Sequence, residues 1–116
     1  MVVHGLSEDD ADRIFHALAD RTRRDIVTRV LHAEQSVSDL AERYSMSFAA
    51  VQKHVAVLER AGLVRKVRRG REQIVHAGLD VIHQAKSLLE SYEHLWRHRV
   101  ARIDALLAET DTTQGD

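Results

Sequence analysis

The stretch from residue 38 to residue 77 constrains the fold more than any other part of this chain. Ser38 is a good N-cap, and the residues after it show apolar side chains at helical spacing. The short turn Ser-Met-Ser follows. Ser47 then caps a second helical pattern over residues 48–61, and Gly62 is a candidate C-cap. Two short helices joined by such a turn form a helix-turn-helix.

The period of the pattern changes directly after this second helix. Residues 63–68 and 72–77 are β-prone runs, and Gly70 lies between them, where a tight turn favours a residue that accepts a positive φ. A basic two-stranded hairpin behind a helix-turn-helix is typical of a wing. We therefore predict a mainly α fold with a small β-hairpin wing over about residues 63–77, a dimeric winged helix-turn-helix.

Two helices are predicted ahead of this motif. The first spans residues 8–19 behind the N-cap Ser7, and the second follows the N-cap Asp20. The apolar face of the second helix is predicted to be Ile26, Val27, Val30 and Leu31, and residues 33–36 are predicted to form a connector.

Three arginines crowd the first turn of the second helix, where the helix dipole disfavours cations. We therefore expect Arg21, Arg23 and Arg24 to have partners elsewhere, either carboxylates or phosphates.

A long helix is predicted over residues 80–109, with apolar residues at alternating spacings of three and four. A chain of this size cannot cover a helix of about 45 Å by itself, so we expect a two-fold dimer built from the first and last helices. The predicted interface residues are Ile14, Phe15, Leu18, Leu89, Tyr92, Trp96, Val100 and Ile103. Residues 1–109 are predicted to form one domain, and residues 110–116 a disordered tail.

The charge of the chain is distributed unevenly, although the net charge is only −1. From Ser47 to Ala77 there are seven Lys or Arg and two Glu, a net charge of +5, and the remainder of the chain carries −6. A basic patch on an acidic body is the electrostatic footprint of a nucleic-acid-binding surface.

The candidate DNA contacts lie in the first turns of the 48–61 helix and at the tip of the hairpin. A helix fits the major groove, where Gln52 can bond adenine, Lys53 can reach guanine or phosphate, and small alanines allow close approach. The hairpin arginines suit phosphates or a minor groove. The predicted set is Ser47, Ala49, Ala50, Gln52, Lys53, His54, Arg68, Arg69 and Arg71. His54 either contacts phosphate or packs against the preceding short helix.

The sequence offers no pattern for catalysis, a cofactor or a membrane span. It has no Cys, no phosphate-binding glycine loop and no paired titratable motif of a hydrolase, so we expect no enzyme activity. No apolar stretch approaches membrane-spanning length and no signal peptide is visible, so we expect a cytoplasmic protein.

Two alternatives to a DNA-binding protein without a metal site remain open. His94 and His98 are one helical turn apart, and with Asp80 and His83 they could bind Zn²⁺ or Ni²⁺ in a metal-sensing repressor. The other explanation is that these histidines are exposed or lie at an interface. A helical interaction module without DNA binding is the alternative of another class, and the basic hairpin disfavours it.

Several strings resemble the ArsR-type winged-helix repressors of bacteria. They are HALADRTRRDIV, SVSDLAERYSMSFAAVQKHVAVLERAGLV and RRGREQ, so the resemblance covers about residues 11–78, and the tail SYEHLWRHRVARIDALL is similar to one branch. The resemblance implies a homodimer formed by the first and last helices. It also implies operator binding by the fourth helix and the wing, with repression relieved by a signal.

The chain departs from that family where many members bind metals. Ser36 and Ser38 stand where the cysteine motif of the third helix would be, and hydroxyls are poor ligands for thiophilic ions. In the last helix Asp80 and His83 are one residue too far apart for the family's second metal site. The chain therefore resembles a branch without recognised metal ligands. No residue pattern specifies an inducer.

Overall fold

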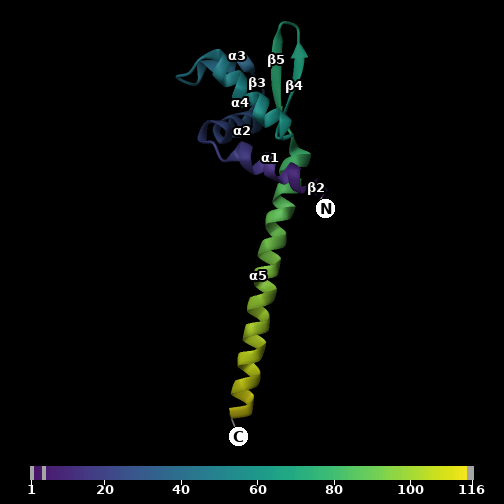
Figure 1. Cartoon of the computed structure of the whole chain (residues 1–116). Helices are drawn as coiled ribbons and strands as arrows, with labels where there is room; N and C mark the ends of the chain where they lie inside the picture. The colour runs from purple at the N-terminus through teal and green to yellow at the C-terminus, as the bar shows by residue number, and fades with distance from the viewer. Residues whose placement is uncertain (1, 4, 115–116) are drawn as a thin grey trace. The chain divides into compact units, whose positions relative to one another are not determined.

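The structure is a computed structural model that describes residues 2–3 and 5–114 (Figure 1). Its elements are β1 (Val2–Val3), β2 (Leu6–Ser7), α1 (Glu8–Leu18), α2 (Arg21–His32), β3 (Gln35–Ser36), α3 (Val37–Glu42), α4 (Phe48–Arg60), β4 (Val64–Arg69), β5 (Glu72–Ala77) and α5 (Leu79–Gln114). The contacts divide the chain into an N-terminal unit, residues 1–85, and a C-terminal unit, residues 86–116, whereas we predicted a single domain over residues 1–109.

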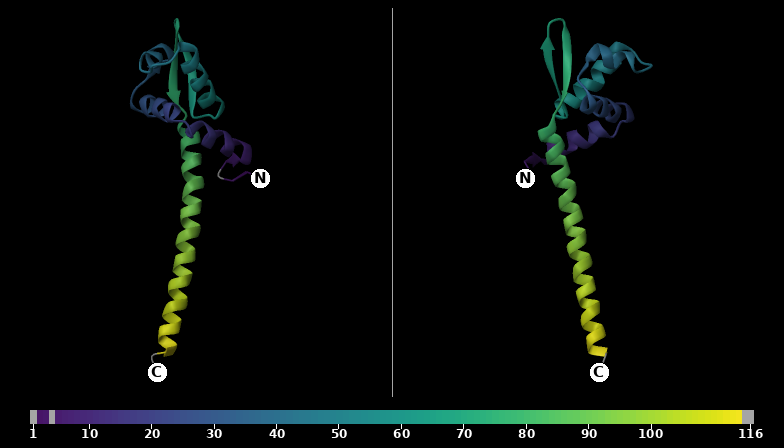
Figure 2. Two further views of the ribbon diagram at one scale, coloured as in Figure 1. Left: turned by 60° about the vertical axis from the view of Figure 1, so that its left-hand side comes forward. Right: turned by 180° about the vertical axis from the view of Figure 1, so that it is seen from behind.

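A three-stranded antiparallel sheet of order β3–β5–β4 lies in the N-terminal unit. Strands β4 and β5 pair in register from Val64 with Ala77 to Arg69 with Glu72, which confirms the predicted hairpin. Strand β3 was not predicted, because two residues are too short to show a strand period. Figure 1 and the reverse view in Figure 2 show α2, α3 and α4 gathered on the same side of the hairpin, whose turn projects past them.

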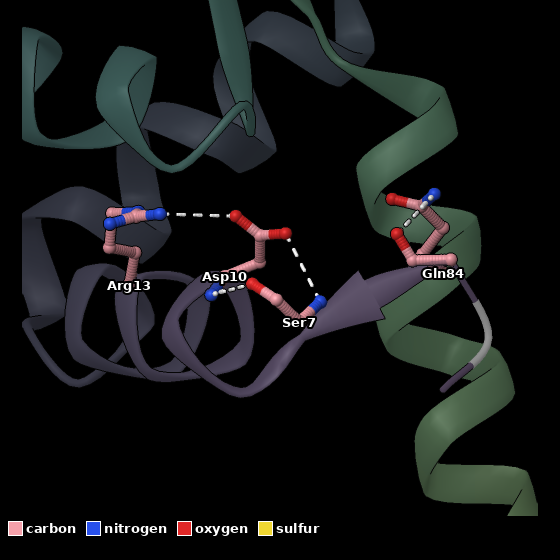
Figure 3. A network of polar contacts seen from close by, with 5 residues as sticks. Ser7, Asp10, Arg13 and Gln84 are labelled. Carbon is pink, nitrogen blue, oxygen red and sulfur yellow. Dashed lines mark hydrogen bonds and ion pairs between the residues drawn. The ribbon is translucent and has the colours of Figure 1, made fainter. Parts of the chain in front are cut away.

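Side-chain caps fix where the helices of this unit begin. Ser7 accepts from the Asp10 amide at 3.0 Å, and the Asp10 carboxylate accepts from the Ser7 amide at 3.1 Å (Figure 3). These bonds hold the pKa of Asp10 below its usual range, since backbone and side-chain hydrogen bonds from Ser7 stabilise its charged form. Gln84 on α5 donates to the carbonyl of Gly5 at 3.4 Å. The N-cap of α2 is Asp20, as predicted.

The predicted N-cap of α3 was wrong by two positions. Ser36, not Ser38, caps the helix, because its hydroxyl oxygen accepts from the Asp39 amide at 2.9 Å and the Asp39 carboxylate accepts from the Ser36 amide at 3.3 Å. The N-cap Ser47 of α4 is confirmed, and its side chain accepts from the Ala50 amide at 3.1 Å.

The core of the N-terminal unit lies between the helices and the inner face of the sheet. Its fully buried large side chains are Ile14, Ile26, Leu40, Leu58, Leu63, Val51, Val55, Val64 and Val75. The predicted inward face of α2 is confirmed for Ile26, Val27 and Val30. It was wrong for Leu31, which is 50% exposed at the end of the helix.

The first turn of α5 approaches the end of α4 so closely that only glycine fits at the junction. The C-cap of α4 is Ala61, one residue before the predicted Gly62, and Gly62 follows it with φ +77°, the left-handed conformation that commonly ends a helix. A Cβ atom on Gly78 would overlap the carbonyl oxygen of Gly62. Beyond this junction Ala85 is buried in the same core, so the start of α5 belongs to the N-terminal unit.

The C-terminal unit is formed by the remainder of α5. The helix continues to Gln114, past the predicted end at residue 109, so the prediction of a disordered tail from residue 110 differs from the structure there. Residues 115 and 116 of that predicted tail lie outside the described residues. No helix in the described part of the chain has both the length and the apolar character to cross a membrane.

A polar cluster of half-buried side chains joins α2 to the turn after α3. The Tyr44 hydroxyl donates to Asp25 at 2.6 Å, and Arg29 donates to the same carboxylate oxygen at 2.8 Å while lying over the Tyr44 ring. These two bonds, the one from Tyr44 foremost, hold the pKa of Asp25 below its usual range. Burial and the neighbouring Asp25 raise the pKa of Tyr44 to about 12.

We predict that Tyr44→Phe lowers the free energy of unfolding by about 1 kcal/mol at pH 7, because it removes one hydrogen bond to a charged group that keeps Arg29 as a partner. The tyrosine lowers the pKa of Asp25 in the folded state. Its contribution is therefore full above about pH 4 and declines as the pH falls below that value. Urea unfolding at pH 7 and pH 3 measures both effects.

The matched control is Ser45→Ala, which removes an exposed hydroxyl from the same turn without removing a partner of Asp25, so any effect on unfolding should be the same at pH 7 and pH 3. An equal loss of stability for Tyr44→Phe at both pH values would contradict the assigned role of Asp25.

Candidate nucleic-acid interface

Helix α4 presents two opposite faces, one to the core and one to solvent. Val51, Val55 and Leu58 are buried at 1% exposure or less, against α2, α3 and β4. Ala49, Gln52 and Lys53 are exposed on the other side, in the first two turns. Because the buried face fixes the rotation of the helix about its axis, these three side chains share one solvent face.

The other predicted contacts on α4 are less accessible. Ser47 is exposed, but its side-chain oxygen already accepts from the Ala50 amide. Ala50 and His54 are half-buried. In the first two turns the solvent face of α4 therefore consists of Ala49, Gln52 and Lys53, with Phe48 at its start, whose exposure the sequence pattern did not indicate.

His54 makes a polar contact with the second helix, α2. Its Nδ1 lies 3.3 Å from an Arg23 guanidinium nitrogen. Arginine can only donate, so Nδ1 accepts and the ring proton of a neutral His54 lies on Nε2. The polar contact of His54 within the chain is therefore with α2, and packing against α3 and contact with a phosphate, the two predicted environments, both stay predictions.

Arg23 also resolves the charge conflict in the first turn of α2. Its guanidinium donates to the carbonyls of Ala17 at 2.7 Å and His16 at 3.1 Å, and Arg24 donates to the Leu18 carbonyl at 2.8 Å. These carbonyls end α1, where the dipole favours cations. The prediction that the arginines have partners was right for Arg23 and Arg24, but the partners are backbone carbonyls rather than carboxylates.

The hairpin turn is a tight connection of Gly70 and Arg71 between the paired residues Arg69 and Glu72. Gly70 adopts φ +64°, as the sequence predicted for this position. Arg68 donates from Nε to the Gly70 carbonyl at 3.2 Å, which keeps its stem against the turn. Arg71 is exposed and forms no ion pair with any residue in the described part of the chain.

Two hairpin cations are engaged by carboxylates of the same chain. Arg69 makes a two-pronged contact with Glu34, at 3.0 and 3.4 Å, and Lys66 lies 3.5 Å from Glu59 on α4. The pKa of Glu34 lies below its usual range, mainly because the Arg69 guanidinium donates hydrogen bonds to the carboxylate and also because of its positive charge. His76 lies near the same carboxylate, at 3.9 Å. The pairing of Arg69 was invisible in the sequence, because the two partners are 35 residues apart.

The residues predicted for dimerisation fall into two groups. Ile14 is only 1% exposed and belongs to the core of its own chain, so it has no surface for a partner, and its inclusion was wrong. Its helix instead exposes the neighbouring Phe15, at 40%, because the two side chains point to different sides of α1. On α5, Leu89, Tyr92, Trp96 and Ile103 are 45–60% exposed, and Val100 is half-exposed.

The histidines weighed as metal ligands do not gather. Asp80, His83, His94 and His98 are all exposed along α5. Within residues 2–3 and 5–114, no group of three or more His, Cys, Asp or Glu side chains is arranged to hold a metal ion.

The geometry of α3, α4 and the hairpin agrees with comparisons to known proteins. A helix-turn-helix domain family matches residues 18–67. The HTH-type transcriptional regulator Rv2034 of Mycobacterium tuberculosis is 47% identical over 53 residues, which cover 46% of this chain and 50% of that protein. The chain thus aligns with half the length of that relative.

Two solved structures match more of the chain. An ArsR-like transcriptional regulator from Rhodococcus sp. RHA1 is 34% identical, with a TM-score of 0.78 and coverage of 87% of this chain and 93% of that one. A homodimeric winged helix-turn-helix DNA-binding domain from Mycobacterium bovis, a possible ArsR-family regulator, has a TM-score of 0.61 at 26% identity, covering 78% and 92%.

The predicted fold and family are therefore confirmed, and both are those of transcriptional regulators rather than of enzymes. The helix-turn-helix, the hairpin wing and the match along nearly the whole of the Rhodococcus protein lead to one conclusion: this chain belongs to the ArsR family of transcriptional regulators.

Proposed function

We propose that this protein is a homodimeric, cytoplasmic repressor that binds an operator in double-stranded DNA and blocks access to a promoter. Helix α4 enters the major groove, and the β4–β5 hairpin contacts the backbone or a minor groove. The proposal goes beyond family membership in naming the contact residues, the assembly and the direction of regulation.

The observation that carries the proposal is the coincidence of an exposed helix face with a concentrated positive charge. Residues 47–77 carry a net charge of +5, and they include both the solvent face of α4 and the hairpin tip. Lys53, Arg65 and Arg71 form no ion pair with any described residue, so their charges are available to phosphates. A protein-docking surface would not need this excess of cations.

The contacts divide by chemistry into base-reading and positioning groups. Gln52 is exposed one turn into α4. Its side-chain amide can both donate a hydrogen bond to adenine and accept one from it in the major groove. Lys53 reaches guanine or phosphate, and the small Ala49 permits close approach. The arginines of the hairpin tip contact phosphates or a minor groove, and contacts to phosphates carry no sequence information of their own. Ser47, Ala50 and His54 flank this surface.

Dimerisation follows from the exposed apolar residues of the C-terminal unit. Large hydrophobic side chains recur along α5 at 45–64% exposure, namely Leu89, Tyr92, Leu95, Trp96, Ile103, Leu106 and Leu107. An exposed stripe of this extent marks an interaction surface. The Mycobacterium bovis relative is a homodimer, which supports a second copy of this chain as the occupant. A two-fold pair would present two copies of α4 to two half-sites.

We predict that DNA affinity falls steeply with salt and that Gln52 and Arg71 contribute differently. If each protomer neutralises about 3–5 phosphates, the slope of log K against log[salt] is about −5 to −9. Gln52→Ala should cost about 1–3 kcal/mol on the preferred sequence only, and Arg71→Ala should weaken binding to all sequences and reduce the slope. Fluorescence anisotropy with a duplex selected from a random library and a scrambled duplex measures these effects.

Arg13→Ala on α1 removes the same charge away from the proposed surface and should leave the salt slope unchanged. A wild-type slope near zero would contradict DNA binding itself. An equal effect of Gln52→Ala on selected and scrambled duplexes would contradict base reading by Gln52 and would leave DNA binding itself standing.

We further predict that Glu34→Gln strengthens binding to any duplex, because Glu34 competes with phosphates for Arg69. Freeing this guanidinium should add about one phosphate contact per protomer and make the salt slope steeper by about 1 for each. Glu90→Gln, the same change on α5, is the matched control. Weaker binding by Glu34→Gln would mean instead that Glu34 orients Arg69 for DNA.

For the dimer, we predict that Trp96→Ala releases the operator although Trp96 contacts no DNA. The indole is 60% exposed in the single chain and offers a large area to a partner, so truncation should cost about 3 kcal/mol or more if the partner buries it fully. Sedimentation equilibrium beside DNA binding measures this effect. Leu79→Ala, an exposed leucine in the first turn of α5, should remain dimeric. A Trp96→Ala protein that stays dimeric with unchanged affinity would remove Trp96 from the interface.

A further inference from the structure

Phe48, the first residue of α4, is a large aromatic side chain with no place in the core. It is 48% exposed, although an aromatic ring is among the side chains with most to gain from burial. It follows the N-cap Ser47 directly, so it lies at the end of α4 that a recognition helix points at base edges. Neither the fold nor the contacts proposed above give this ring a role.

The position of Phe48 on α4 places it on the proposed base-reading face. Phe48 and Gln52 are four residues apart, which separates them by about 40° around the helix axis and about 6 Å along it. Gln52 is exposed, and its neighbour Ala49 is a small exposed residue that leaves the ring accessible. The ring therefore stands beside the side chain proposed to contact adenine, at a separation of one to two base pairs.

The surroundings of the ring indicate what it contacts. Lys53 is exposed in the next turn of α4, and the hairpin cations belong to the same unit, so the expected occupant is polyanionic. Within the major groove of a polyanionic duplex, the apolar group offered to a protein is the C5-methyl group of thymine. An apolar protein partner would have to accept unpaired cations at its edge, which is costly.

We propose that Phe48 selects thymine by packing its ring on the C5-methyl group of a base close to the one contacted by Gln52. This inference rests on the proposed function and adds a second specificity-determining residue to it. Gln52 reads the polar edge of one base pair, and Phe48 reads an apolar group of a nearby one. The preferred half-site therefore contains a thymine whose methyl group, rather than its oxygen, is recognised.

The test separates the methyl group from the rest of the base. A duplex is first enriched from a randomised library by the full-length wild-type protein. Each thymine is then replaced, symmetrically in both half-sites, by deoxyuridine, which differs only in lacking the methyl group. Affinities are measured for the wild type, Phe48→Ala, Phe48→Leu and the control Leu31→Ala, which truncates an exposed leucine of α2. Circular dichroism and sedimentation verify that each variant is folded and dimeric.

At one thymine per half-site, loss of the methyl group should weaken DNA binding by the wild-type protein. The expected loss of affinity is about fourfold for each protomer, and so about 15-fold for the symmetric duplex. Phe48→Ala should bind the thymine and deoxyuridine duplexes equally, both about 15-fold more weakly than the wild type binds the thymine duplex. Phe48→Leu, which keeps an apolar side chain in a residue that favours helix, should retain part of the discrimination. Leu31→Ala should discriminate as the wild type does.

The possible failures are distinguishable. If the library yields no preferred duplex, the proposed function fails and the role of Phe48 fails with it. If a duplex is enriched but Phe48→Ala and Phe48→Leu keep the full wild-type discrimination at every thymine, the methyl group is read by another residue such as Ala49. If no deoxyuridine substitution affects the wild type, no methyl group is read. Either of these last two results overturns the inference while DNA binding stands.

Discussion

The structure depends on the docking of one helix face. Val51, Val55 and Leu58 of α4 are buried against the other helices and the sheet, and their burial is the largest apolar contribution that this helix makes. Because a helix is rigid, burying one side determines which residues face solvent on the other. The accessibility of Gln52 and Lys53 is thus a consequence of core packing. Arg23 supports the same arrangement, since its guanidinium joins the end of α1 to His54 of α4.

Ion pairs within the chain determine which of its cations remain available to bind phosphates. Glu34 holds Arg69 and Glu59 holds Lys66, so the basic hairpin is less positive than its composition indicates. The Arg69–Glu34 pair is exposed and the Lys66–Glu59 pair partly so, and ion pairs open to solvent contribute little to stability. Their main effect is therefore to make these two cations less available to phosphates. Arg71 at the turn has no such carboxylate among the described residues. The charge is therefore most accessible at the projecting tip of the hairpin, where it can reach a phosphate backbone.

Local sequence patterns predicted most of this fold. The errors arose where the structure of a segment depends on contacts with residues far away in the sequence. Ser7, Asp20 and Ser47 were identified as N-caps because the cap is a local hydrogen bond, and Gly70 because its turn needs a positive φ. Strand β3 exists only because β5 lies beside it, and the Tyr44–Asp25 bond joins residues 19 positions apart. The same limit applies to the candidate site. The face of α4 was predictable from its period, whereas the pairing of Arg69 and the exposure of Phe48 depend on where distant residues lie.

The exposed apolar residues of α5 would make DNA binding depend on assembly with a second copy of the chain. Trp96 and the leucines around it would leave apolar area in water if the chain stayed alone, while each N-terminal unit presents only one copy of α4. Covering that area with a second copy would remove the unfavourable exposure and double the number of base and phosphate contacts. Affinity for an operator would then be linked to the monomer–dimer equilibrium, because ligand that binds only the dimer stabilises it by mass action. Any signal that changes the packing along α5 could therefore change occupancy of DNA without contacting α4.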